Sequence, residues 1–162
     1  MILLADANVL IDLYLIEGLT LPSKLAPTEV LDYVLSECDT WHQPGMGSKV
    51  QAAGISIIQT EDNIQHSAAT IKIRGLSFQD RLNIAYARTY KRILLSGEKR
   101  LRDVCGQEGI EIHGSLWLIQ QAHANSLFTK EQLCKWLERL SQSDRYLPEA
   151  ELVMLKKHLG CS

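Results

Sequence analysis

Several features that commonly reveal a protein's class are missing from this 162-residue sequence. No apolar run approaches the roughly 18 residues that a membrane-spanning helix needs, so we expect no membrane partner. The N-terminus lacks the basic flank of a signal peptide, and we therefore expect a cytoplasmic protein. A glycine-rich nucleotide-binding loop is also missing, which argues against a dinucleotide-dependent enzyme.

Cysteine is sparse and widely spaced. The four cysteines, Cys38, Cys105, Cys134 and Cys161, form no CxxC pair. This spacing fits neither a zinc knuckle nor a disulfide framework, so we expect reduced thiols. A chain of this length can bury a hydrophobic core as one domain without such staples.

Charge is nearly balanced over the whole chain, at −2, but it is unevenly distributed. Residues 72–102 contain nine Lys or Arg and two acids, Asp80 and Glu98, which gives a local charge of +7. Basic residues around two acids could hold a phosphate backbone while the acids hold a metal. The alternative is that these basic residues simply cover the solvated faces of helices.

The first twelve residues, MILLADANVLID, organise the rest of the chain. The apolar run Ile2–Ala5 is typical of a buried parallel strand, and it ends at Asp6. A helical apolar pattern follows from Asn8 to Glu17. Asp6 is therefore expected at the carboxyl end of a central strand, where open α/β sheets bind their ligands. Its alternative role is that of a helix N-cap.

Strands and helices alternate along the remaining sequence, which predicts an α/β fold with a parallel sheet and helices on both faces. We expect a single domain over residues 1–162, with a core of about 1–142 and a helical extension over 143–162. Residues Asp39–Gln51 are expected to form a loop. Further strands are expected at Gly54–Gln59, Arg92–Ser96 and Ile110–His113, and further helices at Pro27–Glu37, Glu61–Ile73, Phe78–Tyr90, Glu98–Gly106, Ser115–Ala124, Thr129–Leu140 and Pro148–Leu159.

Three acids are expected at the ligand-binding edge of this sheet. Asp6 follows the first strand, Glu98 follows the strand RILLS by two residues, and Asp80 lies in the first turn of a helix. Carboxylate oxygens are the ligands that Mg²⁺ and Mn²⁺ prefer. Asp80 and Glu98 could instead complement helix dipoles, although Ser77–Asp80 is a weaker capping box than one ending in Glu or Gln.

Four segments resemble the motifs of the PIN-domain family, in the family's order and spacing. Asp6–Asp12 resembles the opening motif, and Ser77–Ala87 resembles the helix that carries the central Asp. Leu94–Arg102 resembles the strand that supplies a hydroxyl residue and then a metal-binding acid. Gly109–Leu116 resembles the last strand and turn of a bacterial subgroup.

This resemblance implies a three-layer α/β/α PIN-like fold with a central parallel sheet and extra C-terminal helices. It also implies an Mg²⁺- or Mn²⁺-dependent endoribonuclease that acts as the toxin of a type II toxin–antitoxin system. The partners would be an RNA substrate, a cognate antitoxin and a second copy of the chain. The implied residues are Asp6, Asp80 and Glu98 as metal-binding catalytic acids, Asn8 and Ser96 as supports, and Arg81, Lys99 and Arg102 as RNA contacts.

Two positions depart from the family pattern. Glu98 stands where the family usually has Asp, and Tyr33 stands where the acid of the second motif is expected when residues are counted from Val30. Glu29 or Asp32 could replace that acid. An alternative function is therefore a degenerate, non-catalytic PIN domain that binds RNA or protein.

Overall fold

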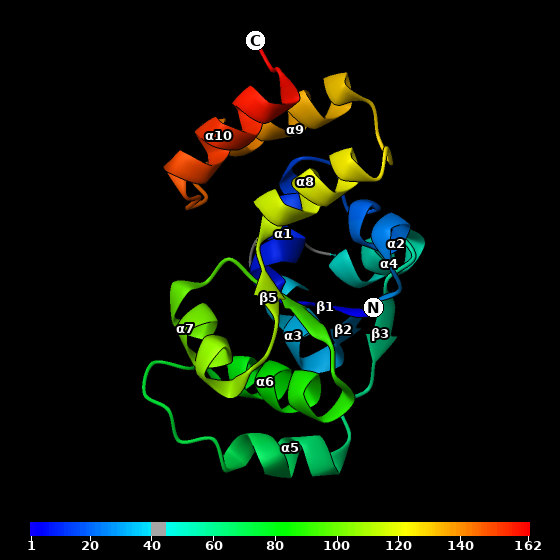
Figure 1. Cartoon of the computed structure of the whole chain (residues 1–162). Helices are drawn as coiled ribbons and strands as arrows, with labels where there is room; N and C mark the ends of the chain where they lie inside the picture. Colours follow the sequence, from blue (N-terminus) through cyan, green and yellow to red (C-terminus); the bar gives the residue numbers. More distant parts are fainter. Residues whose placement is uncertain (40–44) are drawn as a thin grey trace.

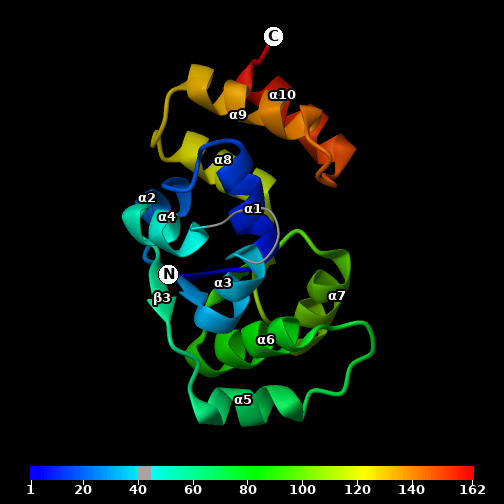
Figure 2. The same ribbon diagram turned by 180° about the vertical axis from the view of Figure 1, so that it is seen from behind.

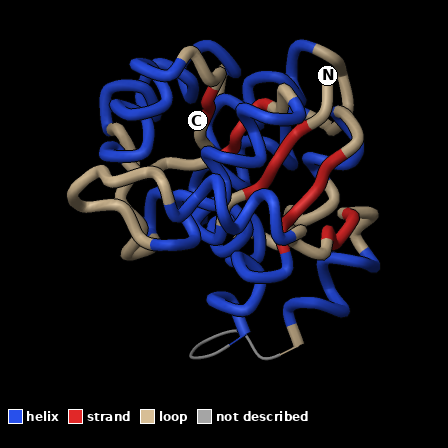
Figure 3. The backbone as a smooth tube through the Cα atoms, turned by 90° about the horizontal axis from the view of Figure 1, so that it is seen from below, coloured by secondary structure: helices blue, strands red, loops and turns tan. Residues whose placement is uncertain are grey.

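A single parallel sheet forms the centre of the protein. The computed structural model describes residues 1–39 and 45–162. Five strands lie in the order β3-β2-β1-β4-β5, and every neighbouring pair is parallel, as predicted. Figure 3 shows these strands side by side. The strands are β1 (Leu3–Ala5), β2 (Thr28–Leu31), β3 (Ser56–Ile58), β4 (Ile93–Leu95) and β5 (Ile112–His113).

Helices cover both faces of the sheet, which gives three layers (Figures 1 and 2). The last two helices, α9 and α10, pack beyond α8, at the end of the molecule opposite α5. No helix in the described ranges is long and apolar enough to cross a membrane. The helices are α1 (Ala7–Leu15), α2 (Leu21–Leu25), α3 (Asp32–Asp39), α4 (Met46–Ala52), α5 (Asp62–Ala69), α6 (Phe78–Tyr90), α7 (Lys99–Glu108), α8 (Ser115–Ala124), α9 (Lys130–Gln142) and α10 (Glu149–Leu159).

The core is divided by the sheet because successive side chains of a strand point to opposite faces. Leu4 and Leu94 are buried on one face with side chains of α3, α5, α6 and α7. Leu3 and Leu95 are buried on the other face with α8, α9 and α10. The short central strands are therefore apolar on both sides, as the run Ile2–Ala5 predicts.

One predicted helix is wrong in its first part. Residues 27–31 were expected to begin a helix, but Thr28–Leu31 form strand β2, and helix α3 begins at Asp32. The apolar residues Val30, Leu31 and Val34 fit a helical period. They fit equally well a buried strand that turns directly into a helix. Residues 28–31 form a strand and not a helix because β2 pairs with both β1 and β3.

The loop predicted over Asp39–Gln51 is also partly wrong, because Met46–Ala52 form helix α4. Met46 and Val50 lie one turn apart and are both fully buried, which anchors this helix on the core. Residues 40–44 of the predicted loop lie outside the described residues.

The prediction of reduced thiols is wrong for two of the four cysteines. Cys134 in α9 and Cys161 after α10 form a disulfide, and their Cα atoms are 5.5 Å apart. Sequence spacing could not show this pairing, because it depends on how α9 packs against α10. Cys105 is a free and buried thiol, as expected.

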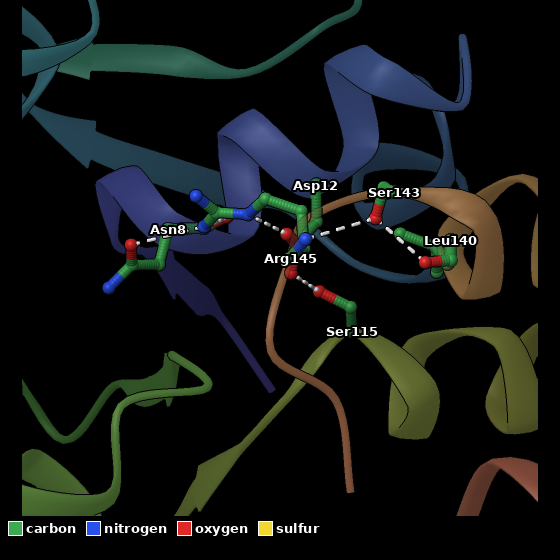
Figure 4. A network of polar contacts seen from close by, with 6 residues as sticks. All are labelled: Asn8, Asp12, Ser115, Leu140, Ser143 and Arg145. Carbon is green, nitrogen blue, oxygen red and sulfur yellow. Dashed lines mark hydrogen bonds and ion pairs between the residues drawn. The ribbon is translucent and has the colours of Figure 1, made fainter. Parts of the chain in front are cut away.

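An ion pair joins the C-terminal extension to the first helix (Figure 4). Arg145, in the loop between α9 and α10, donates from Nε to Asp12 Oδ1 at 2.7 Å. Its Nη2 atom donates to the backbone and side-chain oxygens of Asn8. Ser115, at the start of α8, donates to the second oxygen of Asp12 at 2.7 Å. Two segments that are distant in sequence, the loop after α9 and the start of α8, are thereby fixed to α1.

We expect Arg145→Met to lower the free energy of unfolding by about 2 kcal/mol, because the buried Asp12 carboxylate would lose its charged partner. The matched control is Arg88→Met, since Arg88 forms an ion pair with Glu108 in which both side chains are about 40% exposed. Exposed pairs contribute little, so the control should change stability by under about 1 kcal/mol. Urea unfolding measures both, and equal losses would contradict this account of the network.

Candidate metal centre

Asp6 is fixed at the carboxyl end of the central strand by three hydrogen bonds. It caps α1 by accepting from the Ala7 amide at 2.8 Å. Ser96 Oγ donates to its other oxygen at 2.8 Å, and Asn83 Nδ2 donates at 3.3 Å. Only 3% of Asp6 is exposed to solvent. Both expected roles of Asp6 are therefore present, because it ends a strand and also caps a helix.

Asp80 is presented by the first turn of α6. Its amide donates to Ser77 Oγ, and the Ser77 amide donates back to Asp80 Oδ2, both at 3.0 Å. The capping box that looked weak from sequence is thus complete. This cap holds the side chain of Asp80 in place and buries it to 6% exposure.

Glu98 follows strand β4 and occupies the N-cap position of α7. Its amide donates to Ser96 Oγ at 3.2 Å, while the same hydroxyl donates to Asp6. Ser96 is completely buried. One hydroxyl therefore contacts two of the three predicted acids, Asp6 through its side chain and Glu98 through its backbone amide.

The three predicted acids converge on one point. One carboxylate oxygen from each of Asp6, Asp80 and Glu98 can be chosen so that all three lie within 4.8 Å of one another. Oxygen ligands at such spacing suit a hard divalent cation, and Mg²⁺ typically takes one or two carboxylates plus water. The buried Asn83 side-chain oxygen has no hydrogen-bond partner among the described residues. The donor set therefore fits Mg²⁺ or Mn²⁺.

Two of the carboxylates at this point, those of Asp6 and Glu98, hold their protons more tightly than free side chains do. Burial raises the pKa of Asp6 to about 7, and the charge of Asp80 raises it as well. Burial and Asp80 also raise the pKa of Glu98. Both shifts have the same physical cause, because negative charges are removed from water and placed beside one another. A bound cation would reverse this cost.

A fourth acid, Glu37, belongs to the same electrostatic group and was missed by the sequence analysis. It lies in the last turns of α3, and its pKa is raised by burial, then by the charges of Asp80 and Glu98. Glu37 in turn raises the pKa of Asp6. Glu37 is one helical turn beyond Tyr33, the position at which the acid was sought.

The two proposed substitutes for this acid are occupied elsewhere. Glu29 forms an ion pair with Arg92 at 2.9 Å and accepts from the Tyr86 hydroxyl at 3.0 Å. Asp32 Oδ1 accepts from the amide and the hydroxyl of Thr60. Neither residue joins the group of three acids. The misplaced helix start explains the error, because the count began at Val30, which belongs to a strand.

The asparagine that contacts Asp6 is Asn83 and not the expected Asn8. Asn8, expected to support Asp6, has its side-chain oxygen hydrogen-bonded to Arg145, and Asn83 supplies the amide that contacts Asp6. Asn83 could have been noticed because it is a polar residue on the buried face of α6, three residues after Asp80.

The expected RNA contacts lie on two helices near the acids. Arg81 follows Asp80 in α6, and its Nη2 atom donates to the Ile73 carbonyl at 3.5 Å. Lys99 is exposed at the first position of α7. Arg102 lies one turn further along α7, and its amide donates to the Glu98 carbonyl. Each of the three basic residues therefore lies within four positions of an acid of the group in the sequence.

The raised pKa of Asp6 predicts that the metal-free protein loses stability as pH rises. An unfolded Asp releases its proton near pH 4, whereas folded Asp6 keeps it until about pH 7. Between these values the folded state binds more protons, so the free energy of unfolding should fall by up to about 1.4 kcal/mol per pH unit.

We expect Asp6→Asn to flatten this dependence in urea unfolding measured with EDTA, because the buried charge is removed. Asp103→Asn, an exposed position on α7, serves as the control and should keep the slope of the unsubstituted protein. A slope that is the same in all three proteins would contradict the assignment of the shift to Asp6.

Comparison with known proteins agrees with this arrangement. A protein-family model described as a PIN domain matches residues 2–160. No match was found among curated proteins. The match covers nearly the whole chain, and the parallel sheet, its flanking helices and the acidic group agree with the resemblance seen in sequence. The chain therefore belongs to the PIN-domain family.

Proposed function

We propose that this protein is a metal-dependent endoribonuclease that hydrolyses RNA phosphodiester bonds. The observation that carries the proposal is the convergence of Asp6, Asp80 and Glu98 at one edge of the sheet. The family is one of nuclease folds, and carboxylate groups that hold a divalent cation are what metal-assisted hydrolysis requires.

Each acid would have a distinct part in holding the cation. Asp6 is the most tightly fixed, because Ser96, Asn83 and the Ala7 amide all donate to it. Asp80 and Glu98 approach from the starts of two helices, α6 and α7. A bound Mg²⁺ or Mn²⁺ would supply an activated water and offset the charge that develops on the phosphate.

The side chains around the acids would position the substrate. Lys99 and Arg102 project from the first turns of α7, directly after Glu98, and Arg81 follows Asp80. Cations at these places can contact phosphates on either side of the bond that is cut. Such contacts depend on charge and not on base identity, so they give affinity without selecting a sequence.

Glu37 favours a catalytic protein over a degenerate binding module. The reason to consider the second function was the lack of an acid at the second motif, where Tyr33 stands. Glu37 brings a carboxylate within electrostatic range of Asp80 and Glu98. A carboxylate there can hold a water molecule that belongs to the ligand shell of the cation.

The proposal extends to a cellular role by the resemblance to toxins of type II toxin–antitoxin systems. In that role the substrate is RNA, and the partner is a cognate antitoxin. A second copy of the chain would complete the assembly.

We expect the purified protein to cleave single-stranded RNA with Mn²⁺ and to stop when EDTA is added. Asp80→Asn should lower kcat by about 100-fold or more, because one of three carboxylate ligands is lost. Glu37→Gln should lower activity by about 10-fold to 100-fold, as outer partners of a metal site do. A gel assay of a labelled oligoribonucleotide measures both.

The control is Asp62→Asn, which removes an exposed acid on α5 and should leave the rate unchanged. Equal cleavage by the protein, by Asp80→Asn and in the presence of EDTA would reveal a contaminating nuclease and remove the proposed function.

A further inference from the structure

A cavity of about 490 Å³ lies beside the acidic group, between α7, α8 and α10. Small-molecule sites in proteins usually have volumes of roughly 300–1,000 Å³, so this cavity can hold a nucleoside. None of the acids of the metal centre lines it. Its walls include Gly97, Arg102, Trp117, Tyr146, Leu147 and Met154.

The cavity and the metal centre share one wall. Gly97 lines the cavity and directly precedes Glu98 in the chain. Arg102 also lines it, one helical turn after Glu98. Residues on both sides of Glu98 in the chain therefore line the cavity, which places the cavity next to one acid of the metal centre.

Arg102 provides a cation at this shared wall. Its guanidinium group lies against Gly114, where an added Cβ atom would come within 2.6 Å of Nη2. Its buried Nε atom has no hydrogen-bond partner within the described part of the chain. The carboxylate of Asp12, which also lines the cavity, is already paired with Arg145 and Ser115. Arg102 is thus placed to contact a phosphate that enters from the metal centre.

Aromatic rings supply flat surfaces on other walls. The Trp117 ring stacks on His113, with centroids 4.1 Å apart and planes 6° apart, which holds it in one orientation. Tyr146 is 87% exposed, although it lies only one residue after the well-fixed Arg145. The Arg145 contacts shown in Figure 4 thereby anchor the segment that carries Tyr146. Exposed aromatic rings of this kind stack on bases of single-stranded nucleic acids.

We infer that this cavity binds the base of one RNA nucleotide next to the phosphodiester held at the metal centre. Trp117 and Tyr146 provide the stacking surfaces, and Arg102 contacts the intervening phosphate. This inference rests on the proposed ribonuclease function and adds a base-binding subsite formed by the C-terminal extension. One acid, Glu151, also lines the cavity, but it is exposed and belongs to α10, whereas Arg102 belongs to α7.

RNA fits these walls better than an apolar segment of another protein does. The cation stands at the end nearest the acids, where a nucleic acid would present a phosphate. An apolar peptide would offer no opposite charge to the Arg102 side chain on the cavity wall and would gain nothing from the nearby metal centre.

The test measures binding separately from cleavage. A fluorescent single-stranded oligoribonucleotide is titrated with Mn²⁺ into protein that carries Asp80→Asn, which slows hydrolysis while Asp6 and Glu98 remain to hold the cation, and anisotropy gives the affinity. Tyr146→Ala and Trp117→Leu should each weaken binding by about fivefold or more, because stacking on one ring is lost. Val153→Ala is the matched control, since Val153 is an exposed apolar residue of α10 that does not line the cavity. It should bind as the unsubstituted protein does.

A second titration uses oligoribonucleotides in which one nucleotide at a time lacks its base. When the missing base is the one that enters the cavity, the oligoribonucleotide should bind more weakly to protein that retains Tyr146. The same oligoribonucleotide should bind equally well to protein with Tyr146 and to Tyr146→Ala, because the missing base and the substitution remove the same contact. With Mn²⁺ present, Tyr146→Ala should raise KM for cleavage and leave kcat unchanged. Thermal melting of each variant shows that it is folded.

The outcomes separate this inference from the proposed function. Cleavage that is metal-dependent, with unchanged affinity in both aromatic variants, would overturn the base site and keep the ribonuclease. Base-dependent binding without cleavage would keep the site and remove the ribonuclease. If the chain binds no RNA, the inference is overturned. It is also overturned if Tyr146→Ala leaves RNA binding unchanged and alters only the oligomeric state measured by sedimentation, because Tyr146 would then contact a second copy of the chain.

Discussion

The candidate metal centre places several carboxylate side chains close together, although their negative charges repel one another. Asp6 and Asp80 are buried beside each other, Glu98 lies within 4.8 Å, and Glu37 acts on the group from α3. Burial and like charge both oppose ionisation, which is why the pKa of Asp6 rises to about 7. Ser96, Asn83 and the α1 amide offset part of this cost by donating hydrogen bonds. A divalent cation would offset the rest, and the energetically unfavourable arrangement would then serve as a binding site.

The parallel topology brings these groups together. β1 pairs with β4, so Asp6 and Ser96 leave adjacent strands at the same edge of the sheet. α6 covers one face, and its first turn carries Asp80. On the opposite face, the C-terminal extension packs on α8 and reaches α1 through Arg145. The extension is therefore connected to the helix that Asp6 caps, which links its position to that of the site.

The sequence predicts the fold and the three acids that converge, because both depend on local patterns. Apolar runs show the strands, and each predicted acid follows a strand or begins a helix. Glu37 could not be found in this way, because its place depends on the boundary between β2 and α3, which strand pairing determines. For the same reason α4 and the bond between Cys134 and Cys161 were missed, since both depend on tertiary packing.

The central claim is that these acids form a cation site, and diffraction from crystals soaked in Mn²⁺ tests it most directly. Anomalous scattering locates manganese without reference to any assumed ligand. We predict a peak within about 2.5 Å of carboxylate oxygens of Asp6, Asp80 and Glu98. No peak at this edge of the sheet under saturating Mn²⁺, or a peak held by other residues alone, would contradict the account.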